Sequence, residues 1–149
     1  MALLLPLTPA LLDTLVVPDT PAVLPLPEDE ESWGSLNVVF ATARGNVRRN
    51  AMDAFANVPS NGKFAMRFED DSDDRLIGVA LLDAGDDVLL ASRDGKAIRF
   101  EATAVREFQS RTSTGVRGIT LKGDDEVISL SILHRVGTTS EEREEDLRF

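Results

Sequence analysis

An arginine between two glycines is the feature of this chain whose residue types could bind an anion. The stretch Ser113–Leu121 has the sequence STGVRGITL, in which Arg117 lies between Gly115 and Gly118 and an alternating apolar run follows. Glycine adopts positive φ and lets two backbones approach closely, so such a turn can present a guanidinium beside neighbouring backbone. One turn of this kind is a weak signal, and its meaning depends on what recurs around it.

Residues for covalent or metal chemistry are scarce. The chain has no cysteine and no tyrosine, and His134 is its one histidine. A Ser-His-Asp apparatus or a multi-histidine metal site is therefore hard to assemble, and we expect His134 to be structural. The acidic run 69–74 lacks the ligand spacing and the distal glutamate of an EF-hand, which predicts a solvated turn. The sequence thus predicts no catalytic residue, no metal and no cofactor.

A repeat with an offset of 50 residues organises the middle of the chain. Residues 37–50 align with residues 87–100, so that Gly45 falls on Gly95. Both segments consist of an apolar run, a turn and a second run. Asp-Gly is a strong signal for a two-residue hairpin turn, and Arg-Gly at the equivalent place is a weaker one. Each segment therefore predicts a β-hairpin.

The second half of the repeat also recurs. Residues 60–68 align with residues 113–121, and each segment is followed by an acidic turn and another apolar strand. One unit thus contains two hairpin strands, a connector, a glycine turn, a third strand, an acidic turn and a fourth strand. Four strands in about 50 residues are typical of a β-propeller blade.

We therefore expect an all-β, β-propeller-like chain of four-stranded antiparallel sheets, present as a partial array. Residues 1–36 would form a partial blade and an acidic loop, 37–86 and 87–136 two blades, and 137–149 an acidic tail that could form a short helix. Trp33 would anchor its loop on a blade or face a partner. A cut array leaves unpaired strand edges, through which copies of the chain could associate.

The charge of the chain is distributed unevenly. The net charge is −10, but residues 1–43 carry six acids and no base, and residues 123–149 carry eight acids and three bases. Residues 44–122 carry 12 acids and 13 bases, which is close to neutral. Local charge sets a binding surface, so the net charge does not exclude a nucleic acid. No apolar run is long enough to span a membrane, and the absence of cysteine favours a cytosolic setting.

Basic residues concentrate at the turns and connectors of the repeat. Bases at equivalent turns can form a curved rim that binds a phosphate backbone through many sequence-independent contacts. Ordinary solubilising charge is the alternative. The candidate DNA-binding residues are Arg44, Arg48, Arg49, Lys63, Arg93, Lys96, Arg99, Arg106, Arg111 and Arg117. The expected structural glycines of the turns are Gly45, Gly95, Gly115 and Gly118.

Five segments in a fixed order carry a resemblance to a known family: ATARGNVRR, NGKFAMRF, LIGVALL, DDVLLASRDGKAIRF and STGVRGITL. With them, nearly all of residues 20–136 resembles the C-terminal domain of the bacterial DNA gyrase A protein. The resemblance implies a six-bladed β-pinwheel whose neighbouring blades exchange strands. It also implies a non-catalytic role in which double-stranded DNA wraps around the basic rim during ATP-dependent negative supercoiling.

The same resemblance implies the partners and the setting. The remainder of the gyrase A protein, and through it the gyrase B protein, would be the protein partners, and the location would be the bacterial cytoplasm at the nucleoid. Three departures matter: the glutamine-, arginine- and glycine-rich box of the family is absent, the catalytic tyrosine is absent, and KFAM at residues 63–66 replaces the fuller GVRGI form in the earlier unit. The alternatives are the corresponding C-terminal domain of topoisomerase IV and a propeller fragment that binds proteins through its acidic loops.

Overall fold

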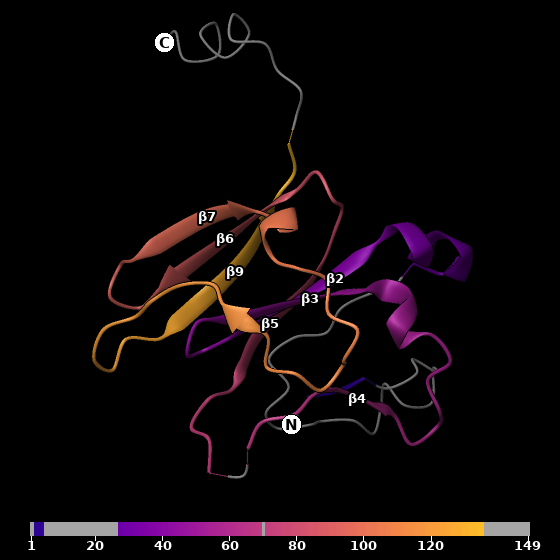
Figure 1. Cartoon of the computed structure of the whole chain (residues 1–149), viewed down its shortest axis with the longest axis horizontal. Helices are drawn as coiled ribbons and strands as arrows, with labels where there is room; N and C mark the ends of the chain where they lie inside the picture. Colours follow the sequence, from indigo (N-terminus) through magenta and orange to yellow (C-terminus); the bar gives the residue numbers. More distant parts are fainter. Residues whose placement is uncertain (1, 5–26, 70, 136–149) are drawn as a thin grey trace, which may run out of the picture.

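The computed structural model describes residues 2–4, 27–69 and 71–135 of the 149-residue chain (Figure 1). Its strands are β1 (Ala2–Leu4), β2 (Asn37–Thr42), β3 (Asn46–Ala51), β4 (Lys63–Met66), β5 (Leu76–Leu82), β6 (Asp87–Ser92), β7 (Ala97–Glu101), β8 (Val116–Arg117) and β9 (Val127–Leu133). Three 3₁₀ helices join them: η1 (Glu30–Ser35), η2 (Met52–Phe55) and η3 (Ala102–Ala104). In this part of the chain no helix is long and apolar enough to cross a membrane. The tail helix expected within 137–149 and most of the partial blade lie outside the described residues.

Each repeat supplies four strands, β2 to β5 and β6 to β9, which confirms the predicted all-β class. The two hairpin turns have the same geometry. Gly45 and Gly95 both have a φ of +88°, and their amides donate to the carbonyls of Thr42 (3.0 Å) and Ser92 (3.1 Å). The glycine at this place lets both turns close with a positive φ.

The strands do not stay within their own repeat. One sheet has the order β5-β2-β3-β8, so the third strand of the second repeat completes the sheet of the first. In this pairing Asn46 lies opposite Arg117 and Val47 lies opposite Val116. The second repeat keeps a three-stranded sheet, β7-β6-β9, and β4 pairs with β1. The exchange of strands implied by the resemblance is thus present between these two units.

A shared hydrophobic core joins the two sheets. Val39 and Leu82 of the first repeat pack in one buried cluster with Val88, Leu90 and Val127 of the second. A Cβ at Gly78 on β5 would lie 3.1 Å from the Leu130 Cβ on β9, so these two strands pack closely. Because this core takes residues from both repeats, each repeat relies on the other to bury its apolar face.

A second core covers the other face of the first sheet. Phe40, Met52, Phe55 and Met66 are buried there, and the Phe40 and Phe55 rings lie 5.7 Å apart. Trp33 of η1 belongs to the same cluster, is 7% exposed, and donates from its indole nitrogen to the Pro27 carbonyl (3.0 Å). Trp33 therefore anchors its loop on the sheet, the first of the two fates expected for it.

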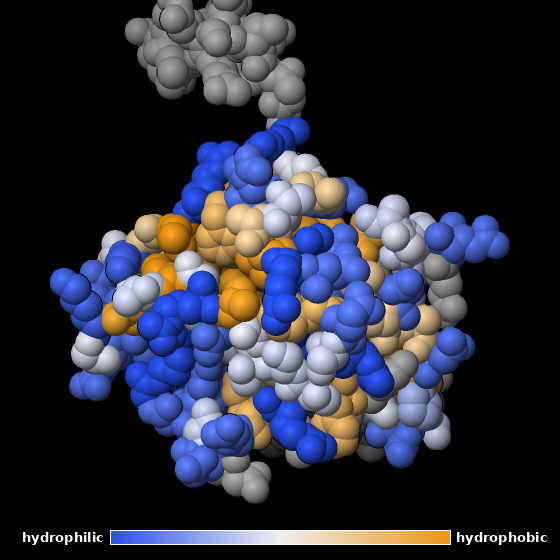
Figure 2. Space-filling view, viewed as in Figure 1, coloured by the Kyte–Doolittle hydropathy of each residue, from blue (hydrophilic) through white to orange (hydrophobic). Residues whose placement is uncertain are grey.

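Hydrophilic residues cover much of the face shown in Figure 2, with hydrophobic residues exposed between them. The large exposed apolar side chains of the described residues include Val116 on β8 and Ile128 on β9, the latter 59% exposed. The outer edge of β7 pairs with no strand in the described part of the chain, whereas β3, its equivalent, carries β8. Association of copies through open edges stays a prediction.

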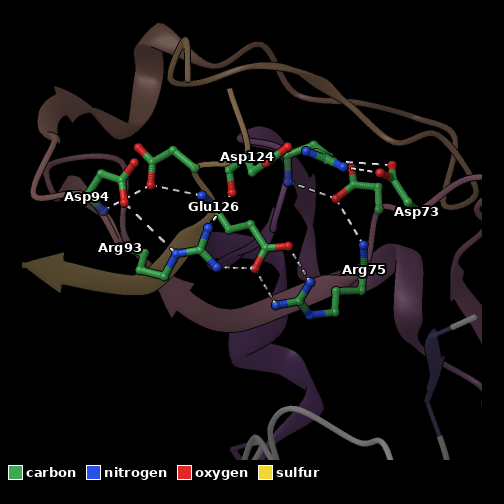
Figure 3. A network of polar contacts seen from close by, with 9 residues as sticks. Asp73, Arg75, Arg93, Asp94, Asp124 and Glu126 are labelled. Carbon is green, nitrogen blue, oxygen red and sulfur yellow. Dashed lines mark hydrogen bonds and ion pairs between the residues drawn. The ribbon is translucent and has the colours of Figure 1, made fainter. Parts of the chain in front are cut away.

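Ion pairs link the acidic turns to the hairpins (Figure 3). Glu126, which precedes β9, accepts two hydrogen bonds of 3.0 Å from the Arg75 guanidinium, and Arg75 precedes β5. Arg93 of the second hairpin lies 3.6 Å from the same carboxylate. Hydrogen bonding by Arg75, helped by charge from both arginines, lowers the pKa of Glu126. One carboxylate thus joins the two repeats at this end of the sheets.

We predict that Gly115→Ala destabilises the fold more than Gly95→Ala. Both glycines have positive φ, which costs alanine about 1 kcal/mol. Only at Gly115 does a Cβ meet backbone, 2.1 Å from the Val47 oxygen, whereas nothing lies within 4 Å at Gly95. Overpacking of this kind costs roughly a further 1–3 kcal/mol. Urea unfolding measures both variants, and equal losses would contradict the close contact between β3 and the glycine turn.

We also predict that Glu126→Gln lowers the melting temperature at neutral pH and that the difference from wild type shrinks in acid. Because the pKa of Glu126 is lowered in the folded state, its stabilisation is complete above the ordinary glutamate pKa. This stabilisation is lost as the pH falls through the folded-state pKa. Melting curves from pH 7 to pH 3 measure the effect.

The matched control is Glu107→Gln, which removes an exposed carboxylate that has no ion pair in the described part of the chain. Its melting temperature should stay close to wild type at each pH. A Glu126→Gln difference that is constant across the pH range would show that charge on this carboxylate does not stabilise the fold.

Candidate nucleic-acid interface

The first hairpin turn packs against the glycine turn of the second repeat. The Gly45 carbonyl accepts hydrogen bonds from the amides of Gly118 (2.8 Å) and Ile119 (3.2 Å). A Cβ at Gly45 would lie 2.7 Å from the Ile119 oxygen, so the two turns touch through their backbones. This contact brings together Arg44 and Arg117, which are 73 residues apart in the sequence.

Arg44 and Arg117 line one open hollow on the surface, together with residues 119–121, Gly123 and Asp125. Both arginines are exposed. Lys96 is close by, because its amine donates to the carbonyl of residue 120, which lines the hollow. Three of the predicted cations therefore converge, two from the second repeat and one from the first.

Arg44 is already partnered by an acid. Its guanidinium pairs with Asp73, and its backbone amide donates to Asp74 Oδ1 (2.8 Å). The pair is exposed, with 38% of the arginine side chain and 72% of the aspartate side chain accessible. The Arg44 hydrogen bond lowers the pKa of Asp73, and the pKa of Arg44 is raised in return. The last two carboxylates of the acidic run, Asp73 and Asp74, thus contact the first hairpin turn.

The second repeat uses the same arrangement. The Asp94 amide donates to Asp125 Oδ1 (3.0 Å), as the Arg44 amide does to Asp74 one repeat earlier. Arg93 donates to the Asp124 carbonyl and lies near Glu126. Each acidic turn therefore holds the hairpin turn of its own repeat and partly neutralises the arginine there.

Arg48 lies inside the protein, where DNA cannot reach it, and this corrects the expectation that it belongs to the rim. It is 0% exposed, and its guanidinium lies 4.4 Å from the centre of the Phe40 ring. It donates to the carbonyls of Arg111 (2.7 Å) and Ser113 (2.5 Å) and to the Asn50 side chain (2.6 Å). Burial lowers the pKa of Arg48 to about 10, so it stays charged at neutral pH.

The other predicted cations differ in how exposed they are and in which groups they contact. Arg49 is half-buried and donates to the Val105 carbonyl (2.8 Å), and Arg99 is exposed but pairs with Asp87 (2.6 Å). Arg106 is exposed and stacks on Phe108, 4.3 Å from the ring centre, and Arg111 is half-buried. Lys63 begins β4, where it lies opposite Leu4 of β1.

Two basic residues that the sequence analysis passed over have clear roles. Arg75 bridges to Glu126, and Arg135 pairs with Asp87 (2.8 Å) and Glu101 (2.7 Å). The sequence contained a signal for the pair between Arg75 and Glu126. Each of these residues directly precedes the fourth strand of its repeat, and the two have opposite charges. His134 pairs with Asp86 (2.8 Å), which gives it the structural role expected.

The comparisons with known proteins agree with this architecture. A family model described as the DNA gyrase C-terminal domain, beta-propeller, matches residues 36–83 and 86–134. The DNA gyrase A protein of Granulibacter bethesdensis is 53% identical over 130 residues, which is 86% of this chain and 14% of that protein. Its counterpart in Salmonella typhimurium is 47% identical over 111 residues, covering 74% of this chain and 12% of that protein. The chain thus spans about one seventh of these relatives.

Solved structures show the same fold. The C-terminal domain of DNA topoisomerase IV superposes with a TM-score of 0.62 at 20% identity, covering 68% of this chain and 31% of that one. The DNA gyrase A C-terminal domain gives a TM-score of 0.56 at 23% identity, covering 65% and 31%. With the family model matching two consecutive units of about 50 residues, this chain belongs to the DNA gyrase C-terminal domain family of β-propellers.

Proposed function

We propose that this chain is a non-catalytic segment of the DNA gyrase A protein that binds the phosphate backbone of double-stranded DNA and bends it around the blades. The observation that carries the proposal is the hollow lined by Arg44 and Arg117, because it joins cations of two repeats at one place on the surface. A duplex is a repeating polyanion, so it can contact cations that neighbouring repeats contribute to one surface. The proposed setting is the bacterial cytoplasm, within the assembled gyrase.

The chemistry of the hollow suits a phosphate better than a base edge. Guanidinium groups pair with phosphate oxygens in a planar, two-pronged geometry. The Asp73 carboxylate that now pairs with Arg44 is exposed, so a phosphate oxygen can replace it in the same geometry. Such contacts position DNA and carry no sequence information, so binding should be indifferent to sequence. The bend that follows has a deformation cost, which further contacts offset.

Among the alternatives, gyrase is favoured over topoisomerase IV. The sequence relatives described above are gyrase A proteins, whereas the likeness to the topoisomerase IV domain is one of fold alone. Supercoiling itself would belong to the whole enzyme, with ATP hydrolysed on the gyrase B protein. The part of this segment would be to bind the DNA and set the path along which it bends.

We predict that the double variant Arg44→Ala/Arg117→Ala weakens binding to any duplex and flattens its salt dependence. If wild type neutralises about four phosphates, the slope of log K against log salt is near −3.6, and losing two contacts brings it to about −1.8. Fluorescence anisotropy with two unrelated duplexes at several salt concentrations measures both quantities.

The matched control is Arg67→Ala/Arg135→Ala, which removes the same two charges from exposed positions outside the hollow. Its slope should stay near the wild-type value, and melting curves should show that both double variants are folded. Equal slopes for the two double variants, or a strong preference of wild type for one duplex, would overturn the assignment of the hollow to phosphate.

A further inference from the structure

The connector of the second repeat, residues 105–115, runs along β3 of the first repeat. The Phe108 amide donates to the Arg49 carbonyl (2.7 Å), and Glu107 forms a parallel bridge with Arg49. Further on, Gly115 presses against the Val47 carbonyl. The connector is therefore shaped by a strand of the neighbouring unit.

Two side chains of β3 complete this attachment. Arg48 donates to the carbonyls of Arg111 and Ser113. Asn50 donates from its amide nitrogen to the carbonyls of Phe108 (2.6 Å) and Ser110 (3.2 Å). Four carbonyls within six residues of connector are thus held by two side chains, both 0% exposed. The Arg48–Asn50 hydrogen bond couples the two holders to each other.

Arginine and asparagine would be unfavourable choices at positions 48 and 50 if these side chains served packing alone. Arg48 is a buried cation that has no carboxylate partner in the described part of the chain, and its charge is met by carbonyl oxygens and the Phe40 face. A buried charge generally contributes less to stability than an apolar residue of its size. What an arginine and an asparagine supply here is a set of directed donors, which specify one conformation of the connector.

The connector carries two of the candidate DNA-binding residues. Arg106 stacks on the Phe108 ring, and the Phe108 carbonyl is held by Asn50. The Arg111 carbonyl is held by Arg48. A chain of contacts therefore runs from β3 of the first repeat to the cations of the second.

We propose that Arg48 and Asn50 are positioning residues, which hold the connector so that Arg106 and Arg111 are preorganised for a DNA backbone. This inference rests on the proposed function and deepens it. A flexible connector would have to be ordered when DNA binds, and that ordering reduces affinity. The first blade thus fixes the binding surface of the second, without touching the DNA through these two side chains.

The test is a double-mutant cycle on DNA affinity. Asn50→Ala should weaken binding about three- to tenfold by releasing the connector. In an Arg106→Ala/Arg111→Ala background the same substitution should have no further effect, because the cations it positions are gone. Asn46→Ala is the matched control on β3, since the Asn46 side chain bonds to Asp74 (3.3 Å) and not to the connector. Any change in affinity that it causes should be the same in both backgrounds, because it does not act through Arg106 and Arg111.

Amide hydrogen exchange tests the positioning without DNA. Asn50→Ala should increase exchange in residues 106–114, and Asn46→Ala should not.

Should Asn50→Ala fail to fold, Phe108→Ala removes the aromatic ring on which Arg106 stacks while leaving β3 intact. Its loss of affinity should likewise disappear when Arg106 is alanine. Additive losses in the cycle, or unchanged exchange in the connector, would overturn the inference. A wild-type chain that binds no DNA would overturn the proposed function, while the exchange data would still decide whether Asn50 holds the connector.

Discussion

The pairing of β8 with β3 is the constraint on which the rest of the structure depends. A two-residue strand from the second repeat closes the sheet of the first, and Gly115 and Gly118 let it approach the backbone and side chain of Val47. This pairing draws the second sheet over the first, so that both contribute to one core. It also sets the first hairpin turn against the glycine turn, which creates the hollow between Arg44 and Arg117. Packing between repeats and the candidate site thus have one origin.

Charged side chains in this protein act mainly through pairs with close neighbours of opposite charge. The acidic turns at 69–74 and 124–126 hold eight of the 26 acidic residues of the chain. They are built into the basic surface, where Asp73 pairs with Arg44 and Glu126 with Arg75 and Arg93. An anion that binds there must compete with these carboxylates. Such competition would make the proposed DNA binding weak and dependent on salt.

Much of the fold followed from the repeat in the sequence, because glycine turns and alternating apolar runs are local signals. The fate of Arg48 was not predictable in this way. Neighbouring residues in a strand point to opposite faces, so Arg48 and Arg49 cannot both lie on one rim. Which of them is buried depends on carbonyl groups more than 60 residues away, at Arg111 and Ser113. The 3₁₀ helix at Met52–Phe55 was also missed, since four residues carry no helical periodicity.

The most direct test of the account is to observe the arginine side chains as DNA is added. In a ¹H–¹⁵N spectrum of the chain titrated with a short duplex, the Nε–H signals of Arg44 and Arg117 should shift together with DNA concentration. The signal of Arg48 should move less than these two, because its guanidinium is buried and its Nε–H donates to Asn50 inside the protein. An Arg48 shift larger than those of Arg44 and Arg117, or a titration in which Arg44 and Arg117 stay unchanged while DNA binds, would contradict the account.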